Sequence, residues 1–434
     1  MSIGRTRFHL GVTAALAFFV TVLGSNGPTP LFPLYVQDLG LTQLDVGIAF
    51  SAYFFGLVAA LFTLARSRLS LYPQFVLPAA LVLTAVADVV FCVMGDNVGL
   101  LCAARVCTGA AVGLATGPAA TFALAALGES GRSMITTTAM LAASVGLGFS
   151  MVVVAVLPSP RTTVFVIHAT VSVVVLVLLT AALINGRRVW RGSVEEMQDV
   201  SPAARPGGDV ARTAVAYSAG ALGWIVGAFA VGIVPTVLVS QDPDLSLVIA
   251  AVPGVACLTA AAAFQMLSTA VGRRMSLSMS LCVLAAGAVV TSVGFAAASV
   301  VVTGLGCVLF GIGQSPSYSG GFRILAGGLS PLQQGRFAAT YSGICYLAAG
   351  LFVLVTGAAG TSWGVLGGTV SAITVFGVAC VALAIRTALR PIEAHTDIEN
   401  PAYIVTTAEV SPAQRADVEP VNLLNRSGTP TSSM

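Results

Sequence analysis

Long apolar segments recur along the whole chain and constrain its fold more than any other feature. A bilayer core needs about 20 apolar residues per helix. The predicted spans are 9–34, 43–65, 75–94, 98–127, 134–157, 163–184, 213–239, 246–271, 276–297, 300–327, 337–360 and 363–386. Only 9% of the residues are charged, whereas a soluble domain carries roughly 25%. We therefore predict an all-α integral membrane protein with twelve transmembrane helices.

One long polar segment divides the spans into two groups of six. Residues 185–212 hold several arginines, acidic residues and prolines, and they cannot bury a core. We predict an N-terminal six-helix bundle at 1–184, a cytoplasmic linker at 185–212 and a C-terminal six-helix bundle at 213–386. The tail at 387–434 is rich in Pro, Thr, Ser and acidic residues, which is typical of a disordered segment.

The two halves also share a sequence pattern. The fourth span contains ARVCTGAAVGLATGP and the tenth contains GCVLFGIGQSPSYSG, each with spaced small residues followed by a proline. Aligning Gly109 with Gly311 puts these two spans at corresponding positions of the halves. Six plus six helices with a central linker is the arrangement of duplicated secondary transporters.

The arginines indicate how the chain is oriented in the membrane. All basic residues are arginine, and such residues accumulate in cytoplasmic loops. With the N-terminus inside, Arg161 alone lies outside, and Arg105 and Arg323 lie within spans. We predict a multi-pass protein of the cytoplasmic membrane with both termini in the cytoplasm. The first span follows basic residues as in a signal peptide, but no A-x-A site follows it, which predicts an uncleaved span.

Two segments resemble motifs of a known family. The first span ends in LGSNGPTPLFPLY, residues 23–35, and the fourth contains an arginine four residues before a glycine. Both are similar to motifs of the twelve-helix drug:proton antiporters of the major facilitator superfamily. The matching residues are Leu23, Gly24, Pro30, Pro33, Leu101, Arg105 and Gly109, and Thr108 stands where the family has Gln. The resemblance implies two pseudo-symmetric six-helix bundles, alternating access and protons as the coupling ion.

Other family motifs are altered. The loop after the second span, LARSRLSLYPQ, keeps Arg66 and Arg68 but lacks the Asp and Gly of the pattern that latches the two halves. The loop after the eighth span keeps Arg273 and Arg274, so these four arginines are the candidates for a conformational latch. In the fifth span Phe149 follows Gly148, in place of the Gly-Pro element that the family associates with antiport.

Ionisable residues inside a membrane span are costly and are functional candidates by default. Asp88, Arg105 and His168 lie at a similar depth, roughly 8–10 Å below the outer ends of their helices at a rise of 1.5 Å per residue. We predict that Arg105 pairs with Asp88 and that His168 lies nearby, which makes the three residues candidates for proton or charge coupling. Arg323 lies near the cytoplasmic end of the tenth span, where an arginine can snorkel.

The substrate cavity is predicted at helix segments that proline and glycine weaken. GSNGPTP in the first span and GQSPSYSG in the tenth are such segments, and transporters use interrupted helices to line cavities. The candidate cavity residues are Asn26, Thr29, Pro30, Gln314, Ser317 and Tyr318, together with Gln265 and Tyr341. Aromatic residues such as Tyr53, Phe54, Trp224 and Tyr346 are more typical of packing or of interfacial anchors.

The sequence argues against an enzyme. It contains no HExxH, no GxSxG, no P-loop and no clustered metal ligands, so we predict no catalytic residue, no cofactor and no metal. The predicted partners are the lipid bilayer, a small-molecule substrate and protons, without nucleic acid. Few charges suit a neutral or weakly cationic apolar substrate, which favours proton-coupled efflux of an amphipathic or apolar compound. Proton-coupled uptake of a small metabolite, or a receptor or assembly protein with the same fold, are the alternatives.

Overall fold

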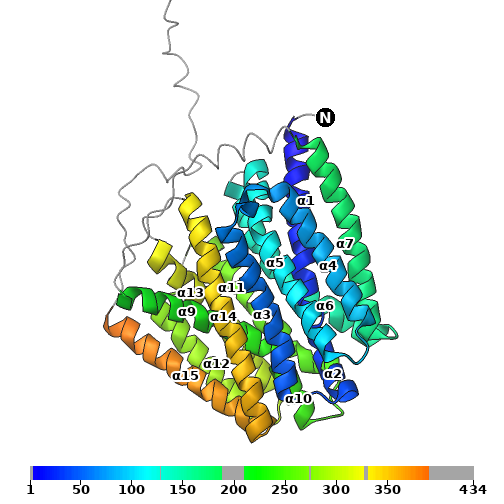
Figure 1. The fold of residues 1–434 in the computed structure, drawn as a ribbon. Helices are drawn as coiled ribbons and strands as arrows, with labels where there is room; N and C mark the ends of the chain where they lie inside the picture. The colour runs from blue at the N-terminus through cyan, green and yellow to red at the C-terminus, as the bar shows by residue number, and fades with distance from the viewer. Residues whose placement is uncertain (1–2, 128, 188–209, 273–274, 327–330, 391–434) are drawn as a thin grey trace, which may run out of the picture. The chain divides into compact units, whose positions relative to one another are not determined.

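The computed structural model describes residues 3–127, 129–187, 210–272, 275–326 and 331–390, which lie in one compact unit, Met1–Ala394. Every regular element in these ranges is a helix, as Figure 1 shows. The N-terminal half contains α1 (Ile3–Asn26), η1 (Thr29–Leu31), α2 (Phe32–Leu39), α3 (Gln43–Arg66), η2 (Arg68–Leu71), α4 (Pro73–Val93), α5 (Val98–Leu127), α6 (Glu129–Val156) and α7 (Pro160–Asn185). The C-terminal half contains α9 (Val210–Gly232), α10 (Val234–Gln241), α11 (Leu247–Val271), α12 (Leu277–Ala296), α13 (Val300–Ala326), α14 (Pro331–Trp363) and α15 (Val365–Leu389).

The predicted membrane fold is confirmed. In the described part of the chain, eleven segments are long and apolar enough to cross a membrane. The fifth predicted span lies in the 28-residue helix α6, whose described part contains the shorter apolar segment Leu141–Val156. The division at residues 185–212 and 387–434 stays a prediction, since 188–209 and 391–434 lie outside the described residues.

The first span is broken where the sequence predicted a weakness. α1 ends at Asn26, a short 3₁₀ turn follows, and α2 begins at Phe32. Pro28 and Pro30 lack the backbone N–H that would continue the helical ladder. The N–H of Gly27 turns back to the carbonyl of Gly24 at 3.2 Å, which closes a tight turn at the break.

The predicted interruption of the tenth span is wrong, and the break in the C-terminal half lies elsewhere. α13 runs as one helix through Pro316, because a single proline removes only one hydrogen bond of the ladder. The seventh span is instead divided at Ile233 into α9 and α10, with Pro235 in the first turn of α10. The first and seventh spans occupy corresponding positions in the two halves, so the broken helix is itself repeated.

Two glycines confirm the internal repeat. A Cβ added at Gly109 would overlap the carbonyl of Tyr53, where α5 crosses α3. A Cβ added at Gly311 would overlap the carbonyl of Cys257, where α13 crosses α11. Both helix pairs therefore approach each other backbone to backbone at the aligned positions. Such close approach is typical of glycine in membrane helices.

The two halves meet along α3 and α14 and along α6 and α11 (Figure 1). The Ser51 hydroxyl donates to the carbonyl of Gly350 at 2.7 Å. The N–H of Leu44 donates to the Thr361 hydroxyl at 3.0 Å. Leu44 lies in the first turn of α3, at the end of the bundle opposite the N-terminus, so hydrogen bonds between the halves close that end.

Candidate functional site

Arg105 lies at the centre of the candidate site as a buried cation. Its side chain is on α5 and only 1% exposed. Nη1 donates to the carbonyl of Ser25 at 2.7 Å, and Nε donates to the carbonyl of Ala49 at 3.4 Å. Among the described residues it forms no ion pair with an acidic side chain. The predicted pairing of Arg105 with Asp88 is therefore wrong.

The break in the first span explains how this charge can be buried. Ser25 is in the last turn of α1, where backbone carbonyls lack partners and the helix carries a partial negative charge. Three aromatic rings also surround the guanidinium, with ring centroids 5.9, 5.3 and 4.9 Å from Cζ for Phe32, Phe50 and Tyr53. Carbonyl oxygens and aromatic faces together replace the missing carboxylate.

Other residues of the break are also held by side chains. Ser150 on α6 donates to the carbonyl of Gly27 at 2.7 Å. The half-buried Asn26 donates to the Ser25 hydroxyl at 3.2 Å, within its own helix end. Thr29 and Pro30 are buried, and the Thr29 hydroxyl has no hydrogen-bond partner among the described residues. Of the three predicted cavity residues in this segment, Asn26 alone is partly exposed.

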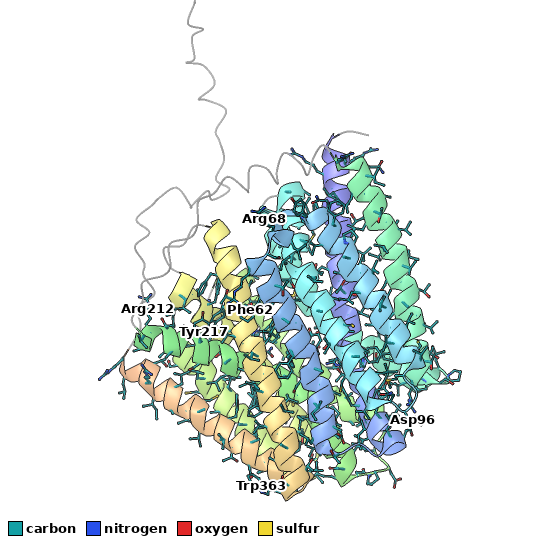
Figure 2. The ribbon with its side chains drawn as sticks, viewed as in Figure 1. Phe62, Arg68, Asp96, Arg212, Tyr217 and Trp363 are labelled. Atoms are coloured by element: carbon teal, nitrogen blue, oxygen red, sulfur yellow. The ribbon has the colours of Figure 1, made fainter. Side chains whose placement is uncertain are left out.

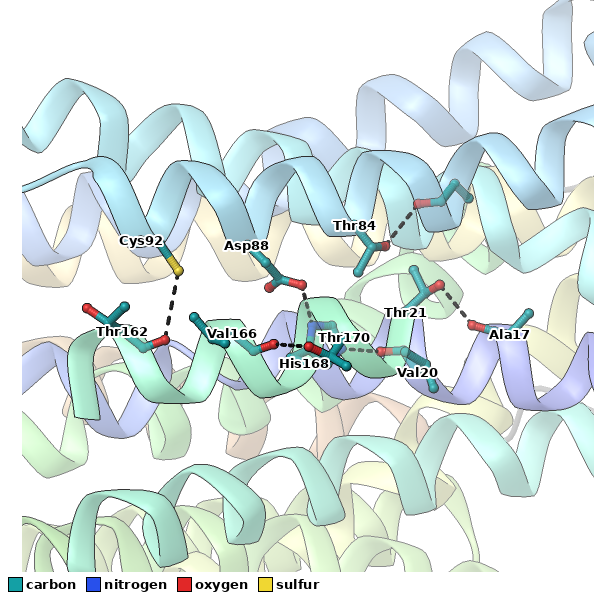
Figure 3. Close-up of polar contacts among 11 residues, drawn as sticks. Ala17, Val20, Thr21, Thr84, Asp88, Cys92, Thr162, Val166, His168 and Thr170 are labelled. Carbon is teal, nitrogen blue, oxygen red and sulfur yellow. Dashed lines mark hydrogen bonds and ion pairs between the residues drawn. The ribbon is translucent and has the colours of Figure 1, made fainter. Parts of the chain in front are cut away.

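Asp88 pairs with His168 instead of Arg105, as Figure 3 shows. Nδ1 of His168 lies 2.7 Å from Oδ2 of Asp88, and Nε2 lies 3.0 Å from the carbonyl of Val20. A carbonyl can only accept, so Nε2 carries a hydrogen. Nδ1 and the carboxylate then share one further proton, and the pair is neutral overall. The pair joins α4, α7 and α1 and is almost fully buried.

The Leu23–Gly24 motif of the first span lies next to the Asp88–His168 pair. A Cβ at Gly24 would overlap the imidazole of His168, so the glycine provides the space that the ring occupies. Leu23 of the same motif lies at a second close approach. A Cβ added at Gly146 on α6 would overlap the carbonyl of Leu23. The Leu-Gly pair therefore lies at close contacts of α1 with both α7 and α6.

In the C-terminal half, several predicted cavity residues hold helices together. Ser317 donates to the carbonyl of Ala219 at 2.8 Å, and the Tyr341 hydroxyl lies 3.1 Å from the carbonyl of Ala216. Both side chains are fully buried and tie α13 and α14 to α9. Gln265 on α11 accepts a hydrogen bond from Ser315 on α13. Gln314 is also nearly buried, with its Oε1 3.9 Å from the Cys257 sulfur.

Five aromatic residues form a continuous row between the two halves. We call Tyr53, Phe54, Trp224, Tyr318 and Tyr346 the aromatic bridge. The centroids of Phe54 on α3 and Tyr346 on α14 are 6.0 Å apart, and those of Tyr346 and Trp224 on α9 are 4.3 Å apart. Trp224 lies 5.7 Å from Tyr318 on α13, and Tyr53 lies 5.1 Å from Phe54. All but Phe54 are partly exposed. For all of these residues except Tyr318, the sequence favours a packing role, because spacing alone does not show which face of a helix an aromatic residue occupies.

The structure describes two of the four arginines that are predicted to form a conformational latch. Arg66 ends α3 and lies over the ring of Phe62, with Cζ 5.4 Å from its centroid. Arg68 follows in η2 at the same end of the bundle (Figure 2). Arg273 and Arg274 lie outside the described residues, so their part in a latch stays a prediction.

Arg161 forms a separate cluster at the opposite end, near the labelled Asp96 in Figure 2. Its guanidinium lies 3.2 Å from Asp38 and 3.6 Å from Asp96, and these side chains are partly exposed. A hollow of about 410 Å³ adjoins this cluster, and a groove of about 850 Å³ lies between α11, α12 and α15. Neither hollow is lined by a predicted cavity residue.

Known structures resemble this fold across almost the whole chain. The nucleoside transporter NupG matches with a TM-score of 0.63 and 14% identity, covering 90% of this chain and 99% of its own. A bacterial homolog of the human lysosomal transporter Spinster matches with 0.63 and 10% identity, covering 88% and 96%. A structure from work on proton dependent oligopeptide transporters matches with 0.60 and 14% identity, covering 88% and 98%. These likenesses show the fold alone.

The sequence itself identifies the family. No curated protein matches the chain. The model of the Major Facilitator Superfamily matches residues 14–352, which include the first-span motif, Arg105 and the aromatic bridge. The chain therefore belongs to the Major Facilitator Superfamily and is a multi-pass membrane transporter, not an enzyme.

Proposed function

We propose that the protein exports an amphipathic or apolar compound across the cytoplasmic membrane by alternating access, with protons as the coupling ion. The observation that carries this proposal is the aromatic bridge, because it joins the two halves with partly exposed rings. The spans of the C-terminal half contain no acidic residue. A surface of rings with few charges suits a compound that partitions into the bilayer.

Alternating access requires the contacts between the halves to break and re-form. The bridge crosses from α3 to α14, and the Ser51–Gly350 hydrogen bond lies along the same pair of helices. If the termini are cytoplasmic, as the arginines predict, these bonds close the outer end. A compound to be exported can then enter from the cytoplasm or the inner leaflet in this state.

The Asp88–His168 pair supports proton coupling. The pair shares one proton, and Asp88 is the only acidic residue buried among the described residues. Release or uptake of a proton would leave a net charge between α1, α4 and α7, which low-dielectric surroundings penalise. We infer that proton exchange requires these helices to move apart, which links the proton to the transport cycle.

Proton flux in energised everted vesicles tests the proposal. An amphipathic substrate added to the cytoplasmic face is expected to collapse the proton gradient with the unaltered protein. Asp88→Asn is expected to abolish this coupling while substrate counterflow continues, and Asp38→Asn serves as the exposed control. Coupling that persists in full in Asp88→Asn would remove the pair from the mechanism.

The altered fifth-span motif favours uptake as the second candidate. α6 is unbroken, and Phe149 follows Gly148 where antiporters of the family carry a proline. Right-side-out vesicles with an inward proton gradient decide between the two directions. Accumulation of a small metabolite there, with no response in everted vesicles, would replace efflux by uptake.

A further inference from the structure

We propose that the aromatic bridge binds a planar ring compound that is neutral or anionic, and that it rejects cations. This inference rests on the transport function proposed above and names the class of substrate. It follows from three observations: the arrangement of the rings, the unpaired charge beside them and a hydroxyl pair at one edge.

The rings come from both halves of the protein. Tyr53 and Phe54 belong to α3, whereas Trp224, Tyr318 and Tyr346 belong to α9, α13 and α14. Edge and tilted contacts connect them, with interplanar angles of 30° for Phe54–Tyr346 and 50° for Trp224–Tyr346. When the two halves separate, the rings that face each other are no longer in contact. A flat ring between them restores offset stacking with both halves, which a saturated molecule of the same size cannot do.

The charge beside the bridge is positive, and among the described residues it forms no ion pair with an acidic side chain. Cζ of Arg105 lies 4.9 Å from the Tyr53 centroid, and Tyr53 is itself part of the bridge. Asp88, the acidic residue that is buried among the described residues, is bound to His168, so that pair adds no net charge. A cation on the other face of Tyr53 would lie roughly 8–10 Å from the guanidinium. At an effective dielectric constant of about 20, repulsion over that distance weakens binding roughly tenfold or more.

This arrangement narrows the class of substrate that the sequence predicts, because that class includes weakly cationic compounds. Sites that accept cations place carboxylates or unopposed ring faces in contact with the ligand. Here the Tyr53 ring already faces a guanidinium, and among the described residues of the C-terminal spans no acidic side chain is present. The positive potential of Arg105 repels a cation and attracts an anionic substituent.

A polar edge can hold a substituent of the ring. The hydroxyls of Tyr318 on α13 and Ser342 on α14 lie 2.7 Å apart. Each hydroxyl has one hydrogen, and their mutual bond uses only one of the two. The other can donate to a ligand oxygen, such as a phenolate, carbonyl or carboxylate. The bridge thus offers ring stacking together with a donor at one end.

Competition binding to the purified full chain tests the inference. The probe is tritiated 2-naphthoate, and the competitors are 2-naphthol, 2-naphthylmethylammonium and decalin-2-carboxylate. We expect 2-naphthol to compete within about threefold of unlabelled 2-naphthoate, whereas the ammonium and the saturated acid compete at least tenfold more weakly. An ammonium that competes as well as the naphthoate would overturn the charge argument. A saturated acid that does so would overturn ring stacking.

Variants locate the binding. Tyr346→Ala is expected to weaken naphthoate binding at least tenfold, Tyr346→Phe to retain it, and Tyr72→Ala, an exposed tyrosine outside the bridge, to leave it unchanged. Equal binding by Tyr346→Ala and the unaltered chain would place the ligand elsewhere. Uptake of the same probe into proteoliposomes separates the two proposals: binding without transport contradicts the transport function, whereas transport of other compounds without naphthoate binding contradicts this inference.

Discussion

At the scale of single residues, Arg105 shows how a membrane protein can bury a cation without an anion. Its guanidinium donates to two backbone carbonyls on different helices, α1 and α3. Removing it leaves buried acceptors without donors, at about 1–3 kcal/mol each. We expect Arg105→Ala to lower the free energy of unfolding by about 2–5 kcal/mol. Arg105→Lys recovers little, because one ammonium lacks the planar fork.

Thermal unfolding in detergent, followed by circular dichroism, measures this effect. Arg161→Ala is the matched control, since it removes an arginine from partly exposed ion pairs that are worth about 0–1 kcal/mol. Equal losses for the two variants would show that the carbonyl contacts of Arg105 contribute no more to stability than a surface pair.

Gly24 is the residue on which the Asp88–His168 pair depends. An alanine there overlaps the imidazole, so we expect Gly24→Ala to break the bond between His168 and Val20 and to destabilise the protein by more than about 2 kcal/mol. The combination with His168→Ala should recover part of that loss, because the ring is gone. Gly148→Ala is the control, since nothing lies within 4 Å of its added Cβ. A destabilised Gly148→Ala variant would contradict the steric explanation.

At the scale of helices, the repeated crossings predict matched behaviour in the two halves. Gly109→Ala and Gly311→Ala both push a Cβ into a backbone carbonyl, which cannot rotate away as a side chain can. We expect both to lower the unfolding temperature in detergent, by several degrees or more. Gly304→Ala on the same helix as Gly311 should be neutral or stabilising, because its added Cβ meets nothing within 4 Å. A tolerated Gly311→Ala would show that the two crossings are not equivalent.

Helix positions could be predicted from the sequence because apolar length alone determines them, and in the part of the chain that the structure describes eleven segments have these properties. The first break could be predicted because three prolines gather within six residues. The break at Ile233 has only one nearby proline, Pro235, and such a pattern also occurs inside continuous helices. The depth of a residue along its helix does not determine the face of the helix on which it lies. The sequence therefore predicts a pair of Asp88 and Arg105, whereas Asp88 faces His168 on α7. The aromatic bridge needs four helices in place and could not be predicted.

At the scale of the whole molecule, the hydrogen bonds between α3 and α14 hold one end of the transporter closed. The Ser51 hydroxyl reaches a carbonyl of the other half, and Thr361 accepts from the N–H of Leu44. Each net bond is worth about 0.5–1.5 kcal/mol. Removing both changes the ratio of closed to open molecules by roughly fivefold to a hundredfold. We therefore expect Ser51→Ala combined with Thr361→Val to favour the state that is open at this end.

Double electron–electron resonance measures this shift, with spin labels on α2 and α10 in a chain whose native cysteines are replaced. The double variant should increase the population at long distances. Thr374→Ala is the control, because its hydroxyl bonds only within its own helix α15. An unchanged distance distribution in the double variant would mean that apolar packing of α3 on α14 closes this end. The aromatic contact between Phe54 and Tyr346 would then be the next contact between α3 and α14 to remove by substitution.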